Sequence, residues 1–416
     1  MTQWSPVWLV EIDGVSYTDA VLANLTIRSG RTNIYEQAQA GYVNLQVLDV
    51  NQTAIPVNIN STISVQVQDT SSSYVPIFGG NVVDIALEVR DVGSTMFTQT
   101  YSITALGALA RLPKFIFEDN LPRDFDGDQI YDVLQQILYN TWAQVAGGVT
   151  WATYTPAGTT WATAENNGLG EIDRPGNYDL AARSSEPIDG YSLVSALATS
   201  GLGYIYEDAQ GRIGYADSTH RTQYLAANGY VDLDANHARA AGLRIETRVG
   251  DVRNAVTIKY GANSNNEVSA SDPVSIAQYG NLAQIITTTL HDATDATAQA
   301  AFYLELRANP EPIFSEITFD LTNPEIDNSD RDNLINVFMG EAISLNNLPL
   351  NMSSGTFQGF VEGWSFQASY NQLSVTLLLS PLAYSLQAMR WNDVPITETW
   401  SSVSPTLDWA NATIVA

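Results

Sequence analysis

The sequence contains no cysteine among its 416 residues and has few basic side chains. Without cysteine the chain has no disulfide framework, no thiolate nucleophile and no cysteine-based metal site. Its 18 Lys and Arg face 45 Asp and Glu, which gives a formal net charge of -27. This balance argues against a nucleic-acid-binding face, which needs a basic patch, and against docking on an anionic membrane.

Long apolar runs are also missing. No stretch approaches the roughly 18 residues that a membrane-spanning helix needs. The first residues, "MTQWSPVWLVEIDG", lack the basic region and the small-residue cleavage site of a secretory signal. We therefore expect a soluble protein that is not exported through such a signal, with a length sufficient for two or three domains.

Catalytic and cofactor motifs are scarce. The three histidines, His220, His237 and His291, lie far apart, without a metal-binding His pair or a Gly-x-Ser-x-Gly elbow nearby. We expect them to be surface or hydrogen-bonded structural residues. The acids follow no preferred spacing, so solvated surface charge is expected in place of a glycosidase-like pair. A phosphate-binding loop and a dinucleotide fingerprint are absent. No catalytic residue and no cofactor is predicted.

One stretch, "DFDGDQIYDVLQ", resembles a calcium-binding loop because Asp124, Asp126 and Asp128 alternate in it. It departs from the pattern in two places: Gly127 comes two positions too early, and Gln135 stands where the bidentate Glu belongs. We expect Asp126 or Asp128 to cap the helix that follows, with at most adventitious Ca²⁺, and predict no metal site.

Residue patterns predict a mainly β protein with an α+β middle section. Apolar and polar positions alternate in short stretches parted by Gly, Asn, Asp and Ser, first before residue 111 and again after residue 241, which is typical of barrels or sandwiches. The predicted parts are a first β-barrel (1–111), an α+β middle domain (112–240), a second β-barrel (241–385) and a C-terminal arm (386–416).

The middle section carries the clearest helical signal. Apolar residues recur at helical spacing in "DGDQIYDVLQQIL", and a second, short apolar helix is expected near "YSLVSALATSG". The stretch "GYIYEDAQGRIGYAD" predicts a hairpin with its turn at residues 209–211. A further helix is expected near residues 292–307.

The two barrels share an order of motifs. Each has a short strand, then a Phe-x-Gly-x-Val turn and strand, then a closing strand that ends in a small Leu-containing segment. The motif residues are Phe78, Gly80 and Val82 in the first part and Phe357, Gly359 and Val361 in the last. The matching order and spacing predict a structural duplication.

The end of the chain holds three tryptophans, Trp391, Trp400 and Trp409, nine positions apart with a proline in each interval. The prolines exclude one continuous helix or strand, so each ring is expected on its own extended piece. The rings either fold back on their own domain or anchor an arm in pockets of a neighbouring protein. In the middle section Trp151 and Trp161, from a repeated "TWAT", are further candidates for exposed loop contacts.

Several segments together resemble minor tail proteins of siphophages. They are "QAQAGYVNLQVLD", "IFGGNVVDI", "GLGYIYEDAQGRIGYAD" followed by Arg221, "GDVRNAVTIKYG", "NPEPIFSEITFDL" and "GFVEGWSFQASYNQLSVTLLLSP", in this order over roughly residues 20–385. The sequence is similar to the tail hub or baseplate hub family, whose fold is shared with contractile-tail hubs and type VI secretion spikes. The closing "WNDVPITETW...LDWANA" is similar to minor tail proteins of phages of Gram-positive, especially actinobacterial, hosts.

The resemblance implies a homotrimer with two tube-forming barrels per chain in a pseudo-sixfold ring. It implies a place at the virion tail tip after assembly in the host cytoplasm, and as partners the hexameric tail tube or distal tail protein, the tape measure protein, and tail fibre or other tip proteins. It carries over no catalytic residue. The duplication independently calls for such a ring, because three chains with two similar barrels present six similar faces.

Three functions compete on the sequence alone. A structural hub would pass DNA through its lumen, where acidic walls would keep the phosphate backbone from sticking. A tail-associated cell-wall hydrolase would need paired acids with perturbed pKa values in a pocket. A glycan-binding adhesin would use exposed aromatics such as Trp151 and Trp161.

Overall fold

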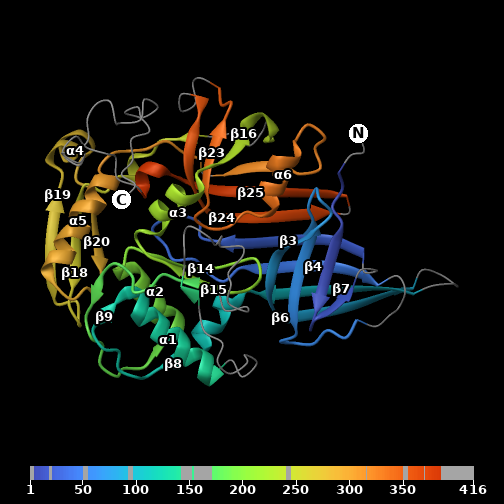
Figure 1. Cartoon of the computed structure of the whole chain (residues 1–416), viewed down its shortest axis with the longest axis horizontal. Coiled ribbons are helices and arrows are strands. Elements are labelled where there is room, and N and C mark those ends of the chain that lie inside the picture. The colour runs from blue at the N-terminus through green and yellow to red at the C-terminus, as the bar shows by residue number, and fades with distance from the viewer. Residues whose placement is uncertain are drawn as a thin grey trace.

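Strands dominate the protein. The computed structural model describes residues 4–17, 21–49, 55–91, 97–141, 152–153, 171–239, 245–314, 316–349, 355–369 and 371–385. A large sheet fills one side of the molecule, a mixed section of helices and short strands lies below it, and a small sheet covered by a helix lies at the opposite end (Figure 1). The mainly β class with an α+β section is thereby confirmed.

Twelve strands form the large sheet. They are β1 (Trp8–Ile12), β2 (Val15–Tyr17), β3 (Val21–Gly30), β4 (Tyr42–Asp49), β5 (Thr62–Gln68), β6 (Tyr74–Asp91), β7 (Phe97–Leu106), β16 (Val231–Asp234), β22 (Ile317–Asp320), β23 (Ala342–Asn346), β24 (Phe357–Ser369) and β25 (Gln372–Pro381). The main path runs β16-β23-β24-β3-β4-β7-β6-β5-β1-β2, with β25 beside β24 and β22 beside β25. All neighbours are antiparallel except β16 and β23. In β5 Ile63, Val65 and Val67 are buried and alternate with more exposed polar residues, as a half-buried strand requires.

The two halves of the chain meet inside this sheet. Residues 363–369 of β24 pair with residues 24–30 of β3, so the blue strand and the orange strands lie side by side in Figure 1. Gly30 makes the close approach possible: its φ is +85°, and a Cβ there would collide with the backbone of Glu362 and Gly363. The strands of both halves therefore belong to one branched sheet whose outermost strands are β16, β2 and β22. The described strands form no closed barrel, and the prediction of two separate barrels is not confirmed.

The middle section packs below the sheet. Its helices are α1 (Asp126–Thr141), α2 (Gly190–Ser200) and α3 (His220–Asn228), and its strands are β8 (Ile116–Phe117), β9 (Asp124–Phe125), β10 (Ala152–Thr153), β11 (Glu171–Ile172), β12 (Asp179–Leu180), β13 (Ile188–Asp189), β14 (Tyr204–Glu207) and β15 (Ile213–Ala216). Ile130, Val133, Leu134 and Ile137 of α1 are fully buried, which confirms the helical spacing. The predicted hairpin is β14–β15. The short β16 leaves this section and joins the large sheet beside β23.

The last part of the chain adds a small sheet and three helices to its strands of the large sheet. It holds β17 (Ile245–Glu246), β18 (Ala255–Tyr260), β19 (Asn266–Ser271), β20 (Ala283–Thr287) and β21 (Ile313–Phe314), with helices α4 (Pro273–Tyr279), α5 (Ala293–Arg307) and α6 (Asn328–Ile335). The small sheet β19-β18-β20 packs against α5, the predicted helix near 292–307. Asp272, Asp292 and Asp327 cap α4, α5 and α6 by accepting hydrogen bonds from backbone N–H groups of the first turn.

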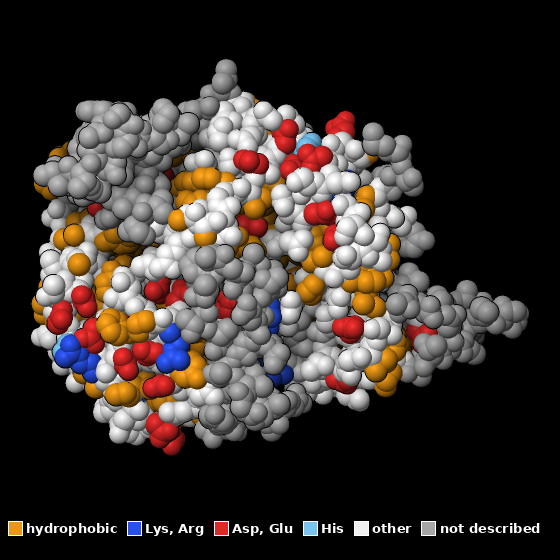
Figure 2. All heavy atoms as spheres, in the orientation of Figure 1, with side chains coloured by type: hydrophobic (Ala, Val, Ile, Leu, Met, Phe, Trp, Pro, Cys, Tyr) orange, Lys and Arg blue, Asp and Glu red, His pale blue; other side chains and the backbone are white. Residues whose placement is uncertain are grey.

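Short 3₁₀ helices close several strands: η1 (Ala108–Lys114), η3 (Ala235–His237), η4 (Val249–Asp251) and η6 (Leu382–Tyr384). Acidic side chains are scattered over the face shown in Figure 2, whereas basic side chains occupy a few places in its lower half. Among the described helices, none is both long and apolar enough to cross a membrane.

Candidate functional site

Two four-stranded units of the large sheet have the same order, β4-β7-β6-β5 and β22-β25-β24-β23. The Phe-x-Gly-x-Val motif occupies the same register in both. The opposed pairs are Phe78–Val65 and Gly80–Ile63 in the first unit and Phe357–Leu345 and Gly359–Ile343 in the second. In each unit a 3₁₀ helix, η1 or η6, begins shortly after the closing strand.

The irregularities of the two units also coincide. A β-bulge follows Val82 where β6 pairs with β7, and another follows Val361 where β24 pairs with β25. The carbonyl of Val82 accepts from the N–H of Asn60, and the carbonyl of Val361 accepts from Gly340, both at 2.7 Å.

Both donors have positive φ, 71° at Asn60 and 87° at Gly340. The five-residue Phe-x-Gly-x-Val motif does not by itself require a β-bulge or a residue of positive φ beside it, so these are two further features that the units share. Their agreement supports the predicted duplication.

The edges of the two units differ. In β24 one side is filled along its length, by β23 at residues 357–360 and by β3 at residues 363–369. In β6 the corresponding side is filled by β5 only as far as Asn81. Within the described part of the chain, no strand pairs with this side of β6 between Val83 and Asp91.

This open edge is apolar. The exposed fractions are 38% at Val83, 52% at Leu87 and 53% at Val89, and Ala86 and Glu88 are exposed as well. A strand side that no described strand covers, with exposed apolar side chains along it, forms a template for another strand. We call residues 83–89 the β6 edge.

A buried ionic cluster lies at the junction of the two units and the middle section. Arg31 follows β3, Arg221 lies in α3, and Glu362 lies in β24; all three are at most 7% exposed. Arg31 Nε donates to Glu362 Oε2 (2.6 Å), and Arg221 donates from Nη1 to Oε1 (2.8 Å) and from Nη2 to Oε2 (2.9 Å). Ser380 donates a further hydrogen bond to Glu362 Oε1.

The electrostatics keep Glu362 ionised. Burial alone would raise the pKa of Glu362, but the guanidinium groups of Arg221 and Arg31 outweigh it and lower the pKa to about 2. Removing Glu362 or either arginine would leave a buried charge without its partner, and this costs several kcal/mol of free energy of unfolding. The cluster therefore fixes three segments that are distant in sequence.

A second buried carboxylate attaches the hairpin β14–β15 to the first unit. Glu207 accepts from the backbone N–H of Gly41 (2.5 Å) and of Leu109 (2.9 Å). Burial raises the pKa of Glu207 to about 7, although these two hydrogen bonds act in the opposite direction. A Cβ at Gly107 would collide with the Glu207 carboxylate, so a side chain there would force this carboxylate to move.

The aspartates of the predicted calcium-like loop serve separate purposes. Asp126 Oδ1 accepts from the N–H groups of Asn177 and Tyr178 (2.8 Å each), and Oδ2 accepts from the Tyr215 hydroxyl. Asp126 thus lies at the start of α1, as expected, but anchors a distant loop. Asp128 pairs with Arg174 at 2.7 Å.

Burial raises the pKa of Asp126 to about 7, the kind of perturbation that a hydrolase acid needs. Its carboxylate, however, is fully buried and both of its oxygens already accept hydrogen bonds. His220 is also buried, and its Nδ1 forms a hydrogen bond with Asp173 Oδ2 at 2.7 Å inside the section. His220 is thus the hydrogen-bonded structural residue that was expected.

One group of possible metal ligands exists among the described residues: His237, Asp327 and Asp330. Asp330 Oδ2 already bonds His237 Nδ1 (2.7 Å) and the N–H of Asp234 (3.1 Å). Asp327 accepts from the N–H of Asp330 as the cap of α6. Each side chain therefore has a structural role in place, and the group does not by itself indicate a metal.

The residues chosen from the sequence as binding sites, Trp391, Trp400, Trp409, Trp151 and Trp161, lie outside the described residues, so their contacts remain predictions.

The sequence analysis missed the ionic cluster and the β6 edge. One signal was available: Glu362 is the only charged residue of "FQGFVEGWSFQAS" and so stands out in a buried strand. Arg221 had been noted only as part of a motif. No spacing rule connects Arg31 to a partner 331 positions away.

No family model and no curated protein sequence matches the chain. Solved structures do. The 43 kDa tail protein of prophage MuSo2 from Shewanella oneidensis is similar over 91% of this chain and 99% of its own, with 13% identity and a TM-score of 0.53. A tail protein from Neisseria meningitidis MC58 is similar over 92% of this chain and 98% of its own, with 10% identity and a TM-score of 0.56. The protein therefore has the fold of phage tail proteins, which at the level of fold confirms the resemblance to the tail hub and baseplate hub family.

Proposed function

We propose that the protein is a structural component of a phage tail, namely the tip hub that caps the tail tube as a homotrimer. The observation that carries the proposal is the repeated sheet unit with one edge filled and one edge open. Three chains supply six units, which matches a hexameric tube, and a closed ring leaves no edge unpaired.

The strand that covers the edge of β24 indicates which segment would cover the equivalent β6 edge. Within the chain β3, beside β4 of the first unit, also covers β24 of the second unit. The counterpart of β3 in the second unit is the chain beside β22 and β21: Ala238 bridges Phe319, and β17 pairs with β21. We propose that this segment of one copy pairs with the β6 edge of the next copy.

The repeat predicts a register for this proposed contact. In the chain, Ser365 of β24 lies opposite Arg28 of β3. Counted from the aligned motifs, Ser365 corresponds to Ala86. Arg28 lies opposite Tyr42 and Ile245 lies opposite Phe314, and the strand pairing of the two units makes Tyr42 and Phe314 equivalent, so Arg28 corresponds to Ile245. Ala86 should therefore lie opposite Ile245 of the partner subunit.

Cysteine cross-linking tests the contact directly, because the natural chain has no cysteine. The double variant Ala86→Cys/Ile245→Cys should form disulfide-linked trimers in assembled particles after mild oxidation, since opposed strand residues have suitable Cβ spacing. Either single variant is the control and should form none. Absence of cross-linking in intact particles, or a reconstruction with six copies at the tail tip, contradicts the proposal.

The remaining partners follow from the same proposal. The ring would join the tail tube or distal tail protein hexamer and the tape measure protein on one side, and fibre or other tip proteins on the other. DNA would pass through its lumen without specific binding. The net charge of -27 supports free passage, because acidic walls repel the phosphate backbone.

We propose no enzymatic role. Asp126 and Glu207, two buried acids whose pKa is raised to about 7, already accept hydrogen bonds from backbone and tyrosine groups, and no observation favours the hydrolase or adhesin alternatives. A wall-digest zymogram and a glycan array should both be negative. Turnover that a single Asp or Glu substitution abolishes would overturn this part of the proposal.

A further inference from the structure

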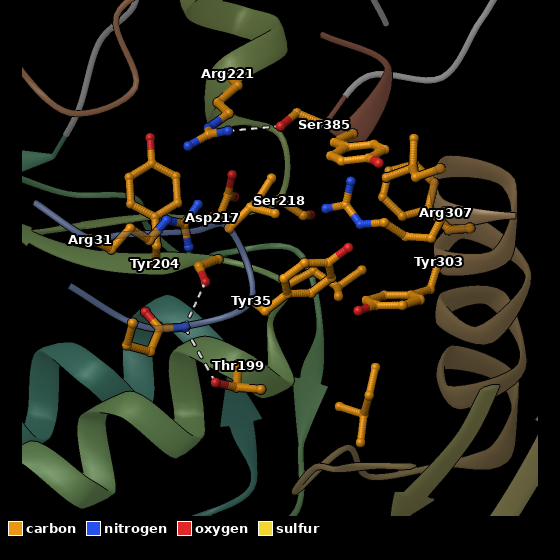
Figure 3. Close-up of a pocket in the computed structure, with 18 of the residues that line it drawn as sticks. Arg31, Tyr35, Thr199, Tyr204, Asp217, Ser218, Arg221, Tyr303, Arg307 and Ser385 are labelled. Atoms are coloured by element: carbon orange, nitrogen blue, oxygen red, sulfur yellow. Dashed lines mark hydrogen bonds between the residues drawn. The ribbon is translucent and has the colours of Figure 1, made fainter. Parts of the chain in front are cut away.

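A cavity of about 150 Å³ lies between the middle section, the loop after β3 and helix α5. Figure 3 shows its lining, in which side chains from these three parts converge. The charged lining residues are Arg31, Asp217, Arg221 and Arg307. Three arginines thus meet at one cavity in a chain that has only 18 basic residues in total.

Arg307 differs from the other two arginines. Arg31 and Arg221 are both paired with Glu362, whereas no described carboxylate forms a salt bridge with Arg307. The side chain is 4% exposed, and its Nε and Nη1 atoms have no hydrogen-bond partner among the described residues.

Aromatic rings surround this guanidinium. Its central carbon lies 4.2 Å from the ring centre of Tyr384, 5.3 Å from that of Tyr35 and 5.8 Å from that of Tyr303. In Figure 3 Arg307 reaches from α5 towards the middle of the cavity, above the rings of Tyr35 and Tyr303 and facing Ser218.

This environment compensates the charge only in part. Aromatic faces attract a cation, and the C-terminal end of α5 carries partial negative charge. Neither supplies the hydrogen-bond acceptors that the two buried donor nitrogens, Nε and Nη1, require. Burial accordingly lowers the pKa of Arg307 from its ordinary value.

The charge around the cavity is positive overall. Arg31, Arg221 and Arg307 face two carboxylates, Glu362 and Asp217, and Glu362 is shared by two of the arginines. The arginines exceed the two carboxylates by one charge, and Arg307 is the one of the three with no described carboxylate partner. The free volume beside it is sufficient for a single phosphate-sized or carboxylate-sized group.

We propose that this cavity binds one small oxyanion, a free phosphate ion or a carboxylate group, with Arg307 as its charged donor. An oxyanion would accept hydrogen bonds from the free N–H groups of Arg307 and neutralise its charge away from bulk water. The site is independent of the proposed ring, because it lies within one chain.

The test measures the melting temperature and, by calorimetry, the anion affinity of the full chain at pH 7. Sodium phosphate and sodium acetate are each compared with sodium chloride at equal ionic strength; acetate is the probe for a carboxylate. Phosphate, acetate or both should raise the melting temperature of the natural protein above its value in chloride.

Arg307→Met keeps the side-chain volume and removes the charge. It should weaken anion binding by about tenfold or more and abolish the anion-dependent shift. In chloride its melting temperature should be equal to or above that of the natural protein, because an uncompensated buried charge is gone. Arg123→Gln removes a cation that is 54% exposed and should keep the full shift.

Three outcomes overturn the proposal: no shift with either anion in the natural protein, an equal shift in Arg307→Met, or a loss of stability in Arg307→Met that no anion affects. If Arg307→Met does not fold, Arg307→Lys replaces it. Lys keeps the charge without the planar donor arrangement, so its shift should be smaller than that of the natural protein, and an undiminished shift counts against the site.

Discussion

Charged residues that are buried hold this acidic protein together at the residue scale. Glu362 accepts hydrogen bonds from two arginines, and Glu207 accepts them from two backbone N–H groups. Asp126 accepts hydrogen bonds from two backbone N–H groups and from a tyrosine hydroxyl. Each carboxyl joins segments that are far apart in the sequence. Because a desolvated carboxylate is costly unless its acceptor sites are filled, these positions constrain the fold strongly.

The first prediction concerns Glu362. Glu362→Gln leaves Arg31 and Arg221 buried without a counter-charge, so the free energy of unfolding should fall by about 3–5 kcal/mol. Urea denaturation measures it. Arg239→Gln is the matched control, because it breaks an exposed ion pair with Asp320 at 3.7 Å and should cost less than about 1 kcal/mol. Similar losses in both variants would show that the cluster has no special role.

The second prediction concerns pH. Burial raises the pKa of Glu341 to about 8, and burial likewise raises the pKa values of Glu207 and Asp126 to about 7. These groups hold protons in the folded protein that the unfolded chain has already lost. The free energy of unfolding should therefore fall as pH rises from about 4.5 to about 8, by on the order of 1 kcal/mol or more per group.

Below this window the sign reverses. The pKa of Glu362 is lowered to about 2, so its contribution is lost as pH falls from about 4.5 towards 2. Stability should be highest near pH 5. Glu341→Gln should flatten the alkaline side of a melting-temperature profile and leave the acidic side unchanged. A profile that rises from pH 5 to pH 8 would contradict these assignments.

At the scale of elements, apolar periodicity and turn chemistry predicted much of the structure. The spacing in α1, the hairpin β14–β15 and the helix α5 were predicted, and the Phe-x-Gly-x-Val motifs located two strands in equivalent register. Helices α4 and α6 were missed because they have seven and eight residues, too few for a periodic signal.

The pairing of β3 with β24 could not be predicted from the sequence, for a different reason. Strand pairing depends on backbone groups that every residue has, so partners more than 300 positions apart carry no local signal. The same holds for Arg31 and Glu362. The β6 edge could be recognised only by comparing the neighbouring strands of β6 with those of β24 in the structure.

The third prediction concerns the β6 edge. Leu87→Lys places a charge on an exposed apolar strand residue, as natural edge strands do to prevent pairing. The melting temperature of the isolated chain should change by little, since Leu87 is 52% exposed, but trimers in assembled particles should be lost.

Val274→Lys is the matched control, because Val274 is 74% exposed on α4 and lies far from β6 in sequence. It should assemble normally. Trimers that survive Leu87→Lys would place the contact between copies elsewhere on the chain.

For the whole molecule, the question is which parts belong to the folded body and which reach beyond it. The large sheet, the middle section and the small sheet share one hydrophobic core cluster. After β25 and η6 the last described residue is Ser385, whose hydroxyl accepts a hydrogen bond from Arg221 Nη1 at 2.7 Å. The tryptophan segment begins directly after this anchor.

The last prediction tests the arm by truncation after Leu386, which keeps Ser385 and its bond to Arg221. Three rings at separated points along one segment would act multivalently, and one ring in a pocket contributes about 2 kcal/mol or more. If Trp391, Trp400 and Trp409 anchor a neighbouring tip protein or fibre, truncation should leave the melting temperature nearly unchanged while that partner disappears from the particle. If the rings cover their own sheet, truncation should expose apolar surface and lower the melting temperature while partners stay bound. Scanning calorimetry of the isolated chain together with the protein composition of purified particles separates the two, and we expect the first result because the segment follows the closing strand of the second unit.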